Sequence, residues 1–345
     1  MSKTLKKLLC LALSALMLAG TLTACGGGTE ETEPTETAVT EPPEEAKVLK
    51  VLTIGHSLGV DCGNTLNRVF AYEGTGDYEE VIISTLYYSG CPLYKHVNYL
   101  TANSPEYNLY LSSSKTPDEK PTIMESVTMY DALRFDYWDI IVMMGGVFEI
   151  AESATYTDGK IQIIQNYVND NKLNPNAIFA WHMPWATPVD NTLRDMYPKE
   201  TNSYYTNYEK YDNNRTNFYN AITKCVGDHI VTDETFEFLI PSGTALENAL
   251  SSYLEEKDIH RDYAHASDYG RIIASYVWYC SIMGIDKIDE VKMADVPASF
   301  LKNPLGSQPL VLTDAQKDIL IESVNNALAN PLQMTQSQYT EAPAQ

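Results

Sequence analysis

Ser57 stands at a corner of the chain where its hydroxyl could act as a nucleophile. It lies in the segment "IGHSLGVD", directly after the apolar run 48–54, and residues with helical spacing follow it. A serine between a strand and a helix can form a turn, cap the helix, contact a phosphate group or attack an electrophilic carbon. This segment by itself leaves all four roles open.

A carboxylate and an imidazole lie close together near the other end of the chain. In "DIHRDYAHASDYGR", Asp262 precedes His265 by three residues, just before a helix that Ser267 would cap. That spacing allows the carboxylate to fold back onto the imidazole Nδ1–H, so that Nε2 is free to accept a proton from a hydroxyl. An isolated Asp-x-x-His segment is more often a surface turn. In combination with Ser57, however, it predicts nucleophilic catalysis with His265 as the base and Asp262 as the group that orients it.

Five short apolar runs predict the strands of a sheet that would position these residues. Turn residues bound them, segments with helical spacing separate them, and they cover 48–54, 80–86, 139–144, 177–182 and 236–240. This alternation predicts an α/β fold, a three-layer α/β/α sandwich with a mainly parallel, flavodoxin-like sheet. Such sheets bind ligands at the carboxyl ends of their strands, where Ser57 would lie.

Helical spacing predicts helices over 64–72, 161–171, 245–253 and 267–283, and Thr313 with Gln316 forms a capping box for a last helix through Leu328. Residues 101–122 look irregular, and we interpret them as a surface insertion. A stripe of residues within 203–226 is either a platform on which sugars stack or, as we favour, the core face of an amphipathic helix. It consists of Tyr204, Tyr208, Tyr211, Arg215, Phe218 and Ile222.

The order Ser57, then Asp262 and His265, resembles that of the SGNH, or GDSL-type, hydrolase superfamily. "YYSGCPLYKH" matches its second block, and the resemblance implies that the Gly90 N–H joins the Ser57 N–H in an oxyanion hole. "YWDIIVMMGG" falls where the third block belongs. Within the superfamily, the chain is most similar to a branch of bacterial secreted proteins and lipoproteins that has IGNS, GGCSL, WD, WHMTWA and PxGTAxxN. The corresponding segments here are IGHS, SGCPLYKH, YWD, WHMPWA and PSGTALEN.

The chain departs from that pattern at two places. His56 stands where the superfamily usually has Asp and this branch often has Asn. The third block lacks the side-chain amide that would be a third oxyanion donor, and losing one such donor typically costs about 10²–10³ in rate. We predict that His56, Met144, Gly145 and His182 lie at the pocket, although His182 is equally well a buried structural histidine.

The first residues predict export and a lipid anchor. A basic start with Lys3, Lys6 and Lys7 precedes the apolar stretch 8–20, and Leu22-Thr23-Ala24-Cys25 resembles a bacterial lipobox. We therefore expect a lipoprotein signal peptide over 1–24 and lipidation of Cys25, which would attach the protein to the extracytoplasmic face of the cell membrane. Residues 25–47 predict a disordered acidic tether, 48–332 the SGNH hydrolase-like domain and 333–345 a flexible tail.

Composition bears on partners and cofactors. The chain has 24 Lys and Arg and 46 Asp and Glu, so its formal net charge of −22 argues against nucleic acid or an anionic bilayer surface as a partner. Cysteines 62, 91, 225 and 280 match no zinc pattern, and the six histidines show no metal-ligand spacing. Cys91 is either a pocket thiol or, as we favour, a small core residue. We expect neither a metal nor a cofactor.

Two functions follow from these observations. The first is a serine esterase or deacylase that acts outside the cell on a small-molecule or glycan ester, such as an O-acylated glycan, as the superfamily resemblance implies. The second is a noncatalytic cell-surface lipoprotein that binds a glycan through a relic hydrolase pocket. The missing third-block amide and the many tyrosines favour the second, whereas the joint presence of Ser57, Asp262 and His265 favours the first.

The lipobox predicts a covalent modification that can be measured directly. Metabolic labelling with a fatty-acid analogue should mark the wild-type protein and leave Cys25→Ala unlabelled, because the Cys25 thiol is the expected acceptor. Label that persists in Cys25→Ala would contradict the lipoprotein assignment.

Overall fold

The computed structural model describes residues 47–147, 149–196, 209–288 and 310–343. The expected signal peptide, Cys25 and the tether up to residue 46 lie outside these ranges. None of the helices within them is both long and apolar enough to cross a membrane.

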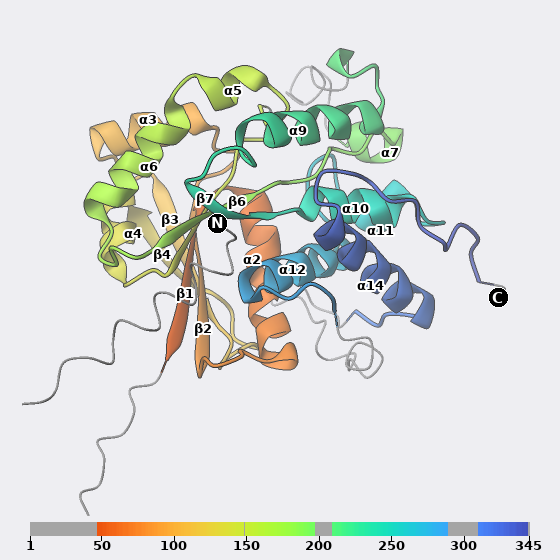
Figure 1. Cartoon of the computed structure of the whole chain (residues 1–345), viewed down its shortest axis with the longest axis horizontal. Coiled ribbons are helices and arrows are strands. Elements are labelled where there is room, and N and C mark those ends of the chain that lie inside the picture. Colours follow the sequence, from red (N-terminus) through yellow and green to blue (C-terminus); the bar gives the residue numbers. More distant parts are fainter. Residues whose placement is uncertain (1–46, 148, 197–208, 289–309, 344–345) are drawn as a thin grey trace, which may run out of the picture. The chain divides into compact units, whose positions relative to one another are not determined.

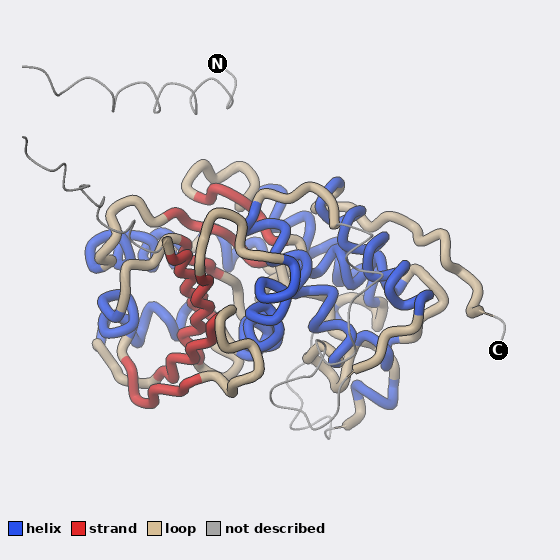
Figure 2. The backbone as a smooth tube through the Cα atoms, turned by 90° about the horizontal axis from the view of Figure 1, so that it is seen from below, coloured by secondary structure: helices blue, strands red, loops and turns tan. Residues whose placement is uncertain are grey.

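A seven-stranded sheet has the order β4-β3-β2-β1-β5-β6-β7. Its strands are β1 (Val48–Gly55), β2 (Glu80–Tyr87), β3 (Tyr107–Ser113), β4 (Thr122–Val127), β5 (Ile140–Met143), β6 (Ile178–His182) and β7 (Phe236–Ile240). β2, β1, β5, β6 and β7 run parallel to one another. The expected α/β class with a mainly parallel sheet is confirmed, and Figure 2 shows helices on both sides of the strands.

The expectation of an irregular insertion over residues 101–122 was wrong. These residues contain β3, which pairs antiparallel with β2 on one side and with β4 on the other. Tyr107 and Leu109 are fully buried and alternate with partly exposed residues, as in a strand with one face on the core. In β4 only Val127 is buried, so the strand has no apolar run by which the sequence could reveal it.

Helices cover the two faces of the sheet (Figure 1). The buried apolar side chains form two separate hydrophobic cores. One face carries α2 (Ser57–Glu73), α10 (Ser242–Leu250), α11 (Glu256–Ile259), α12 (Asp268–Met283) and α14 (Asp314–Ala329). The other carries α3 (Leu93–Ala102), α4 (Met129–Phe135), α5 (Ser153–Thr157), α6 (Lys160–Asn171) and α9 (Arg215–His229). Successive residues of β1 enter opposite cores, Val51 the first and Leu52 the second. This arrangement is the three-layer sandwich.

The predicted helices are present, but two of them have different bounds: α10 covers Ser242–Leu250 rather than 245–253, and α2 starts earlier than predicted. That helix begins at Ser57 itself, with His56 as its N-cap, rather than near residue 64. The predicted capping box of Thr313 and Gln316 opens α14. A short helix, α7 (Asn191–Arg194), follows β6.

The tyrosine stripe lies only partly within the described residues. Tyr204 and Tyr208 fall outside them, and α9 starts at Arg215. Phe218 and Ile222 are buried in the core, as the core-face interpretation requires. Tyr211, before the helix, stacks on Phe218 with ring centroids 4.8 Å apart.

The C-terminal segment packs against α10 and α14 instead of hanging free. The Thr335 N–H donates to Asn248 Oδ1 at 2.7 Å, and the Tyr253 N–H donates to the Tyr339 carbonyl at 2.9 Å. Asn248 is buried in α10, and the tail supplies the donor for its Oδ1 while its Nδ2–H donates to the Ser323 carbonyl of α14 at 3.1 Å. Polar composition alone had suggested a flexible tail.

The segments WHMPWA and PSGTALEN meet where β6 and β7 end. The Gly243 N–H donates to the Met183 carbonyl at 2.9 Å, and a Cβ at Gly243 would lie 2.4 Å from the Pro184 carbonyl oxygen. The Trp185 Nε1–H donates to the Ala264 carbonyl at 2.8 Å. WHMPWA therefore supports the turn that contains Asp262 and His265.

This close approach predicts that Gly243→Ala destabilises the protein by about 1–3 kcal/mol, because the added methyl overlaps backbone atoms that cannot move aside. Gly227→Ala is the matched control. Its Cβ would meet only Leu332 Cδ1, at 3.1 Å, the end of a flexible side chain. Replacing a helical glycine there should be neutral or stabilise by up to about 1 kcal/mol. Urea unfolding measures both, and equal stabilities of Gly243→Ala and wild type would contradict the prediction.

Candidate active site

The corner between β1 and α2 presents the Ser57 side chain at the carboxyl edge of the sheet. Gly55, the last residue of β1, has no room for a side chain, since a Cβ there would lie 2.5 Å from Met144 Sδ. The His56 ring accepts a hydrogen bond from the Leu58 N–H and so caps α2. Ser57 is the first helical residue and is partly exposed. Close packing therefore explains the glycine at position 55, and capping of α2 explains His56. Ser57 begins the helix with its side chain partly exposed.

Ser57, His265 and Asp262 form one hydrogen-bonded chain. His265 Nε2 lies 2.8 Å from Ser57 Oγ, and His265 Nδ1 lies 2.9 Å from Asp262 Oδ2 and 3.0 Å from Oδ1. An ionised carboxylate only accepts, so Nδ1 carries the proton and Nε2 is left to accept one from the Ser57 hydroxyl. The structure brings together the three residues that the sequence selected for catalysis.

The Asp262 carboxylate is fixed by its own turn. Besides the imidazole, Oδ1 accepts the backbone N–H groups of Ala264 at 2.9 Å and His265 at 2.8 Å. Burial raises the pKa of Asp262, but these hydrogen bonds outweigh it and lower the pKa to about 2. Asp262 is therefore ionised at neutral pH and accepts the Nδ1–H of His265 as a carboxylate.

Two backbone N–H groups belong to the loops at this edge of the sheet that the sequence resemblance assigns to an oxyanion hole. One is that of Ser57 itself at the N-terminus of α2, and the other is that of Gly90 in the loop after β2, where Gly90 has φ +57°. Within the described part of the chain, neither N–H donates to a protein acceptor. The Tyr88 N–H donates to the Gly55 carbonyl at 3.4 Å, which joins the two loops at the sheet edge.

The loop after β5 lies beneath this site. His56 Nε2–H donates to the Gly145 carbonyl at 3.1 Å, and a Cβ at Gly146 would lie 2.7 Å from Pro92 Cα. Met144 is buried and packs against Gly55. The loop thus lies against both neighbouring loops, and residues 144–147 include no side-chain amide.

A family model described as "Domain of unknown function (DUF4886)" matches residues 50–298. The chain belongs to this family. The DUF4886 match includes Ser57, Gly90, Asp262 and His265, so the whole hydrogen-bonded chain lies inside it. No curated protein matches the sequence.

Another member of the DUF4886 family has a similar crystal structure. It is a protein from Bacteroides uniformis ATCC 8492 with 22% sequence identity and a TM-score of 0.67, and the match covers 86% of this chain and 100% of that chain. The two proteins therefore share a fold. A protein from Slackia heliotrinireducens, described as a candidate SGNH hydrolase, matches at 13% identity and a TM-score of 0.41, covering 68% of this chain and 100% of that chain. Neither likeness identifies the reaction, which has to follow from the site itself.

His182 and Cys91, the remaining candidates, are buried. The His182 ring makes edge contacts with the rings of Trp185 and Trp278, with centroids 6.3 and 5.0 Å away, and burial lowers its pKa to about 3. Burial raises the pKa of the Cys91 thiol to about 12, which leaves it protonated and unreactive. His56, Met144 and Gly145 are also buried. All five residues therefore lie in the interior of the protein rather than on an exposed pocket wall.

Three charged residues next to the site were not anticipated from the sequence. Asp61 lies one turn after Ser57 on α2, and its carboxylate binds the guanidinium groups of Arg261 and Arg271. The sequence signal for this cluster was an acidic residue, Asp61, on the apolar side of a helix.

Among the described residues, no group of three His, Cys, Asp or Glu side chains could hold a metal ion.

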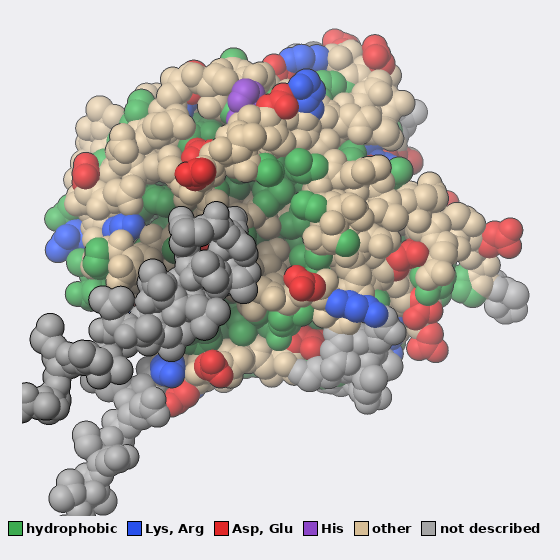
Figure 3. All heavy atoms as spheres, viewed as in Figure 1, with side chains coloured by type: hydrophobic (Ala, Val, Ile, Leu, Met, Phe, Trp, Pro, Cys, Tyr) green, Lys and Arg blue, Asp and Glu red, His purple; other side chains and the backbone are tan. Residues whose placement is uncertain are grey.

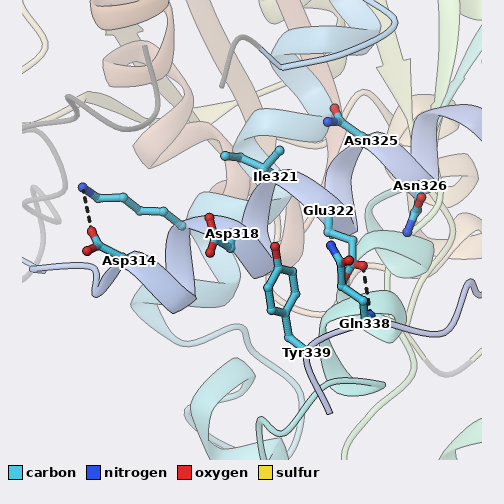
Figure 4. A pocket seen from close by; sticks show the side chains of 9 residues that line it. Asp314, Asp318, Ile321, Glu322, Asn325, Asn326, Gln338 and Tyr339 are labelled. Atoms are coloured by element: carbon cyan, nitrogen blue, oxygen red, sulfur yellow. Dashed lines mark hydrogen bonds and ion pairs between the residues drawn. The ribbon is translucent and has the colours of Figure 1, made fainter. Parts of the chain in front are cut away.

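A cavity of about 620 Å³ lies elsewhere, along α14 and the C-terminal segment (Figure 4). Acidic and amide side chains line most of it, and Glu322 accepts the Gln338 N–H at 3.0 Å. None of the described residues that line it is a histidine, serine or cysteine. It therefore offers no pair of nucleophile and base.

The buried capping histidine predicts how stability varies with pH. Burial lowers the pKa of His56 from its ordinary 6.5 to about 4, although the hydrogen bond to Gly145 opposes this. Between these values the unfolded chain binds a proton that the native imidazole does not, so stability falls as the pH decreases from 6.5 to 4. Asn at position 56 also caps a helix but does not titrate.

At pH 5, we therefore expect His56→Asn to lower the slope of unfolding free energy against pH by about 1.2 kcal/mol per pH unit. Urea unfolding between pH 4.5 and 7 measures this slope in both proteins. Parallel curves would show that His56 is not buried as a neutral base.

Proposed function

We propose that this chain is a serine hydrolase of the SGNH type that cleaves an ester. The continuous hydrogen-bonded chain from Asp262 through His265 to Ser57 carries this proposal. Its distances and its order of a hydroxyl, an imidazole and a carboxylate support the roles of nucleophile, base and orienting group in acyl transfer. The sequence resemblance to the superfamily supports the same assignment.

In the first half of the reaction, Ser57 Oγ attacks the ester carbonyl carbon while His265 Nε2 takes the hydroxyl proton. The N–H groups of Ser57 and Gly90 stabilise the oxygen that becomes negative, and Asp262 stabilises the imidazolium. The carbon–oxygen bond to the alcohol then breaks, and the alcohol leaves with the proton from Nε2. Ser57 is left as an acyl ester.

In the second half, a water molecule attacks the acyl carbon and gives its proton to His265 Nε2. The bond to Ser57 Oγ breaks, the carboxylic acid leaves, and the imidazole returns the proton to the serine. Because the proposed site has two backbone N–H donors and no side-chain amide donor, we expect a rate about 10²–10³ lower than that of a site with a third donor. The positive end of the α2 dipole favours the same oxyanion.

The proposed setting is the outer surface of the cell. Lipidation of Cys25 would anchor the domain to the membrane through the acidic tether, where O-acylated glycans are accessible substrates. The net charge of −22 disfavours nucleic acid and phospholipid headgroups and favours neutral or cationic esters. On the face in Figure 3, the Lys and Arg side chains are scattered and form no basic patch. The mechanism requires no cofactor.

The test is covalent labelling and ester turnover. Purified protein should react with a fluorophosphonate probe and hydrolyse p-nitrophenyl acetate slowly, and Ser57→Ala should abolish both signals because the attacking oxygen is gone. Mass spectrometry of the labelled peptide should locate the phosphonate on Ser57. Cys91→Ala is the control, since that thiol is buried and should contribute to neither signal.

Asp262→Asn tests the orientation of the His265 imidazole while the attacking Ser57 hydroxyl is kept. The change should leave the fold intact and reduce turnover by up to about 10⁴, because the imidazole would be held in the wrong tautomer.

The alternative function predicts a different result: no turnover and no labelling by the wild type, together with glycan binding that Ser57→Ala leaves unchanged. That result would replace the hydrolase with a glycan-binding protein.

A further inference from the structure

Asp61 binds two separate segments to the helix that carries Ser57. Its side chain is 4% exposed. Oδ1 accepts from Arg271 Nη2 at 2.8 Å, from Arg271 Nε at 3.0 Å and from Arg261 Nη1 at 3.0 Å. Oδ2 accepts the Ala266 N–H at 3.2 Å. One carboxylate therefore holds a backbone N–H and two guanidinium groups.

The contacts fall on both sides of His265. Ala266 follows the histidine directly, and Arg261 precedes Asp262. Arg261 Nη1 also donates to the Ala266 carbonyl at 2.6 Å, and the Arg261 N–H donates to the His265 carbonyl at 3.0 Å. The two ends of the turn are thus hydrogen-bonded to each other and to Asp61 of α2.

Asp61 and Ser57 are four residues apart on one helix, which places them about one turn apart on the same side. The distance between Ser57 Oγ and His265 Nε2 depends on the position of the turn relative to α2. Asp61 fixes that position through a rigid helix turn at one end and the Ala266 backbone at the other.

We propose that Asp61 is a positioning residue for the reaction, which sets the contact between Ser57 and His265 by clamping the turn 261–266 onto α2. This inference rests on the proposed function for its effect on rate. Opening of the turn can be measured whether or not the protein turns over esters, so the clamp can be tested separately from the reaction.

Arg261 and Arg271 have different parts in this clamp. Arg271 belongs to α12, is 10% exposed and also binds Asp268, so it joins the two helices. The Arg261 side chain is 39% exposed and belongs to the turn itself. Changing Arg261 therefore loosens the turn without leaving a buried charge unpaired, whereas changing Asp61 leaves Arg271 without its main partner.

The experiment compares four variants of the full chain with the wild type. Asp61→Asn replaces one acceptor oxygen with an amide NH₂, and Arg261→Met removes the guanidinium at similar length. Arg261→Lys is the conservative variant, because an ammonium group has three donors for the contacts that Nη1 makes alone. Glu247→Gln is the matched control, since the Glu247 carboxylate is 2% exposed, binds Arg215, and has no described hydrogen bond to Ser57, Asp262 or His265.

Two quantities are measured for each folded variant. Hydrogen exchange reports opening of the turn, and Asp61→Asn and Arg261→Met should exchange the amides of residues 261–266 faster while the strands keep wild-type protection. The rate of fluorophosphonate labelling and kcat for p-nitrophenyl acetate should fall by about 10–10² with KM changed little, because displacement of the base affects the reacting atoms. Arg261→Lys should recover most of the loss, and Glu247→Gln should change neither quantity.

Exchange at 261–266 that stays at the wild-type rate in Arg261→Met overturns the clamp, even if Asp61→Asn fails to fold. Faster exchange without any fall in labelling overturns the positioning role. A wild type that neither labels nor hydrolyses, but whose turn opens in both variants, refutes the hydrolase and retains the clamp.

Discussion

The common direction of five strands is the constraint on which the site depends. β2, β1, β5, β6 and β7 run parallel, so their carboxyl ends meet at one edge of the sheet. The loops that leave this edge contain Ser57, Gly90, Gly145 and Trp185, residues far apart in the sequence. Ser57 and His265 are separated by 208 positions and still form a hydrogen bond. No local segment could create this contact, and the sheet makes it possible by bringing the loops together.

The parts of the structure that the sequence predicts are those whose signal is local. Buried parallel strands are continuous apolar runs, so all five were located within one residue at each end. The turn of Asp262 and His265 depends on a spacing of three residues. By contrast, β4 exposes five of its six residues and has no such run. Asp61 was missed because its partners Arg261 and Arg271 lie 200 and 210 positions away, and only the fold reveals them.

His56 shows why one departure from the family pattern is compatible with the same local structure. Its neutral ring accepts the Leu58 N–H through Nδ1 and donates to the Gly145 carbonyl through Nε2. An asparagine has the same combination, an acceptor oxygen and a donor NH₂, whereas an ionised aspartate could only accept. The imidazole can therefore cap the helix and hold the loop after β5, which an Asn at this position could also do. A histidine achieves this only while it stays uncharged, and burial ensures that.

The contacts of Asp262 determine how the base is prepared for proton transfer. Two backbone N–H groups hold its carboxylate, so it cannot rotate away when His265 becomes positively charged. In the proposed reaction the imidazolium would meet a negative charge that is already in place, so that no reorganisation would be needed at that moment. With the two oxyanion donors that we propose, the reaction would depend more strongly on this pair and on the distance between His265 and Ser57. That distance is set by the carboxylate of Asp61, which touches none of the reacting atoms, so the rate depends on the packing of α2 against the turn.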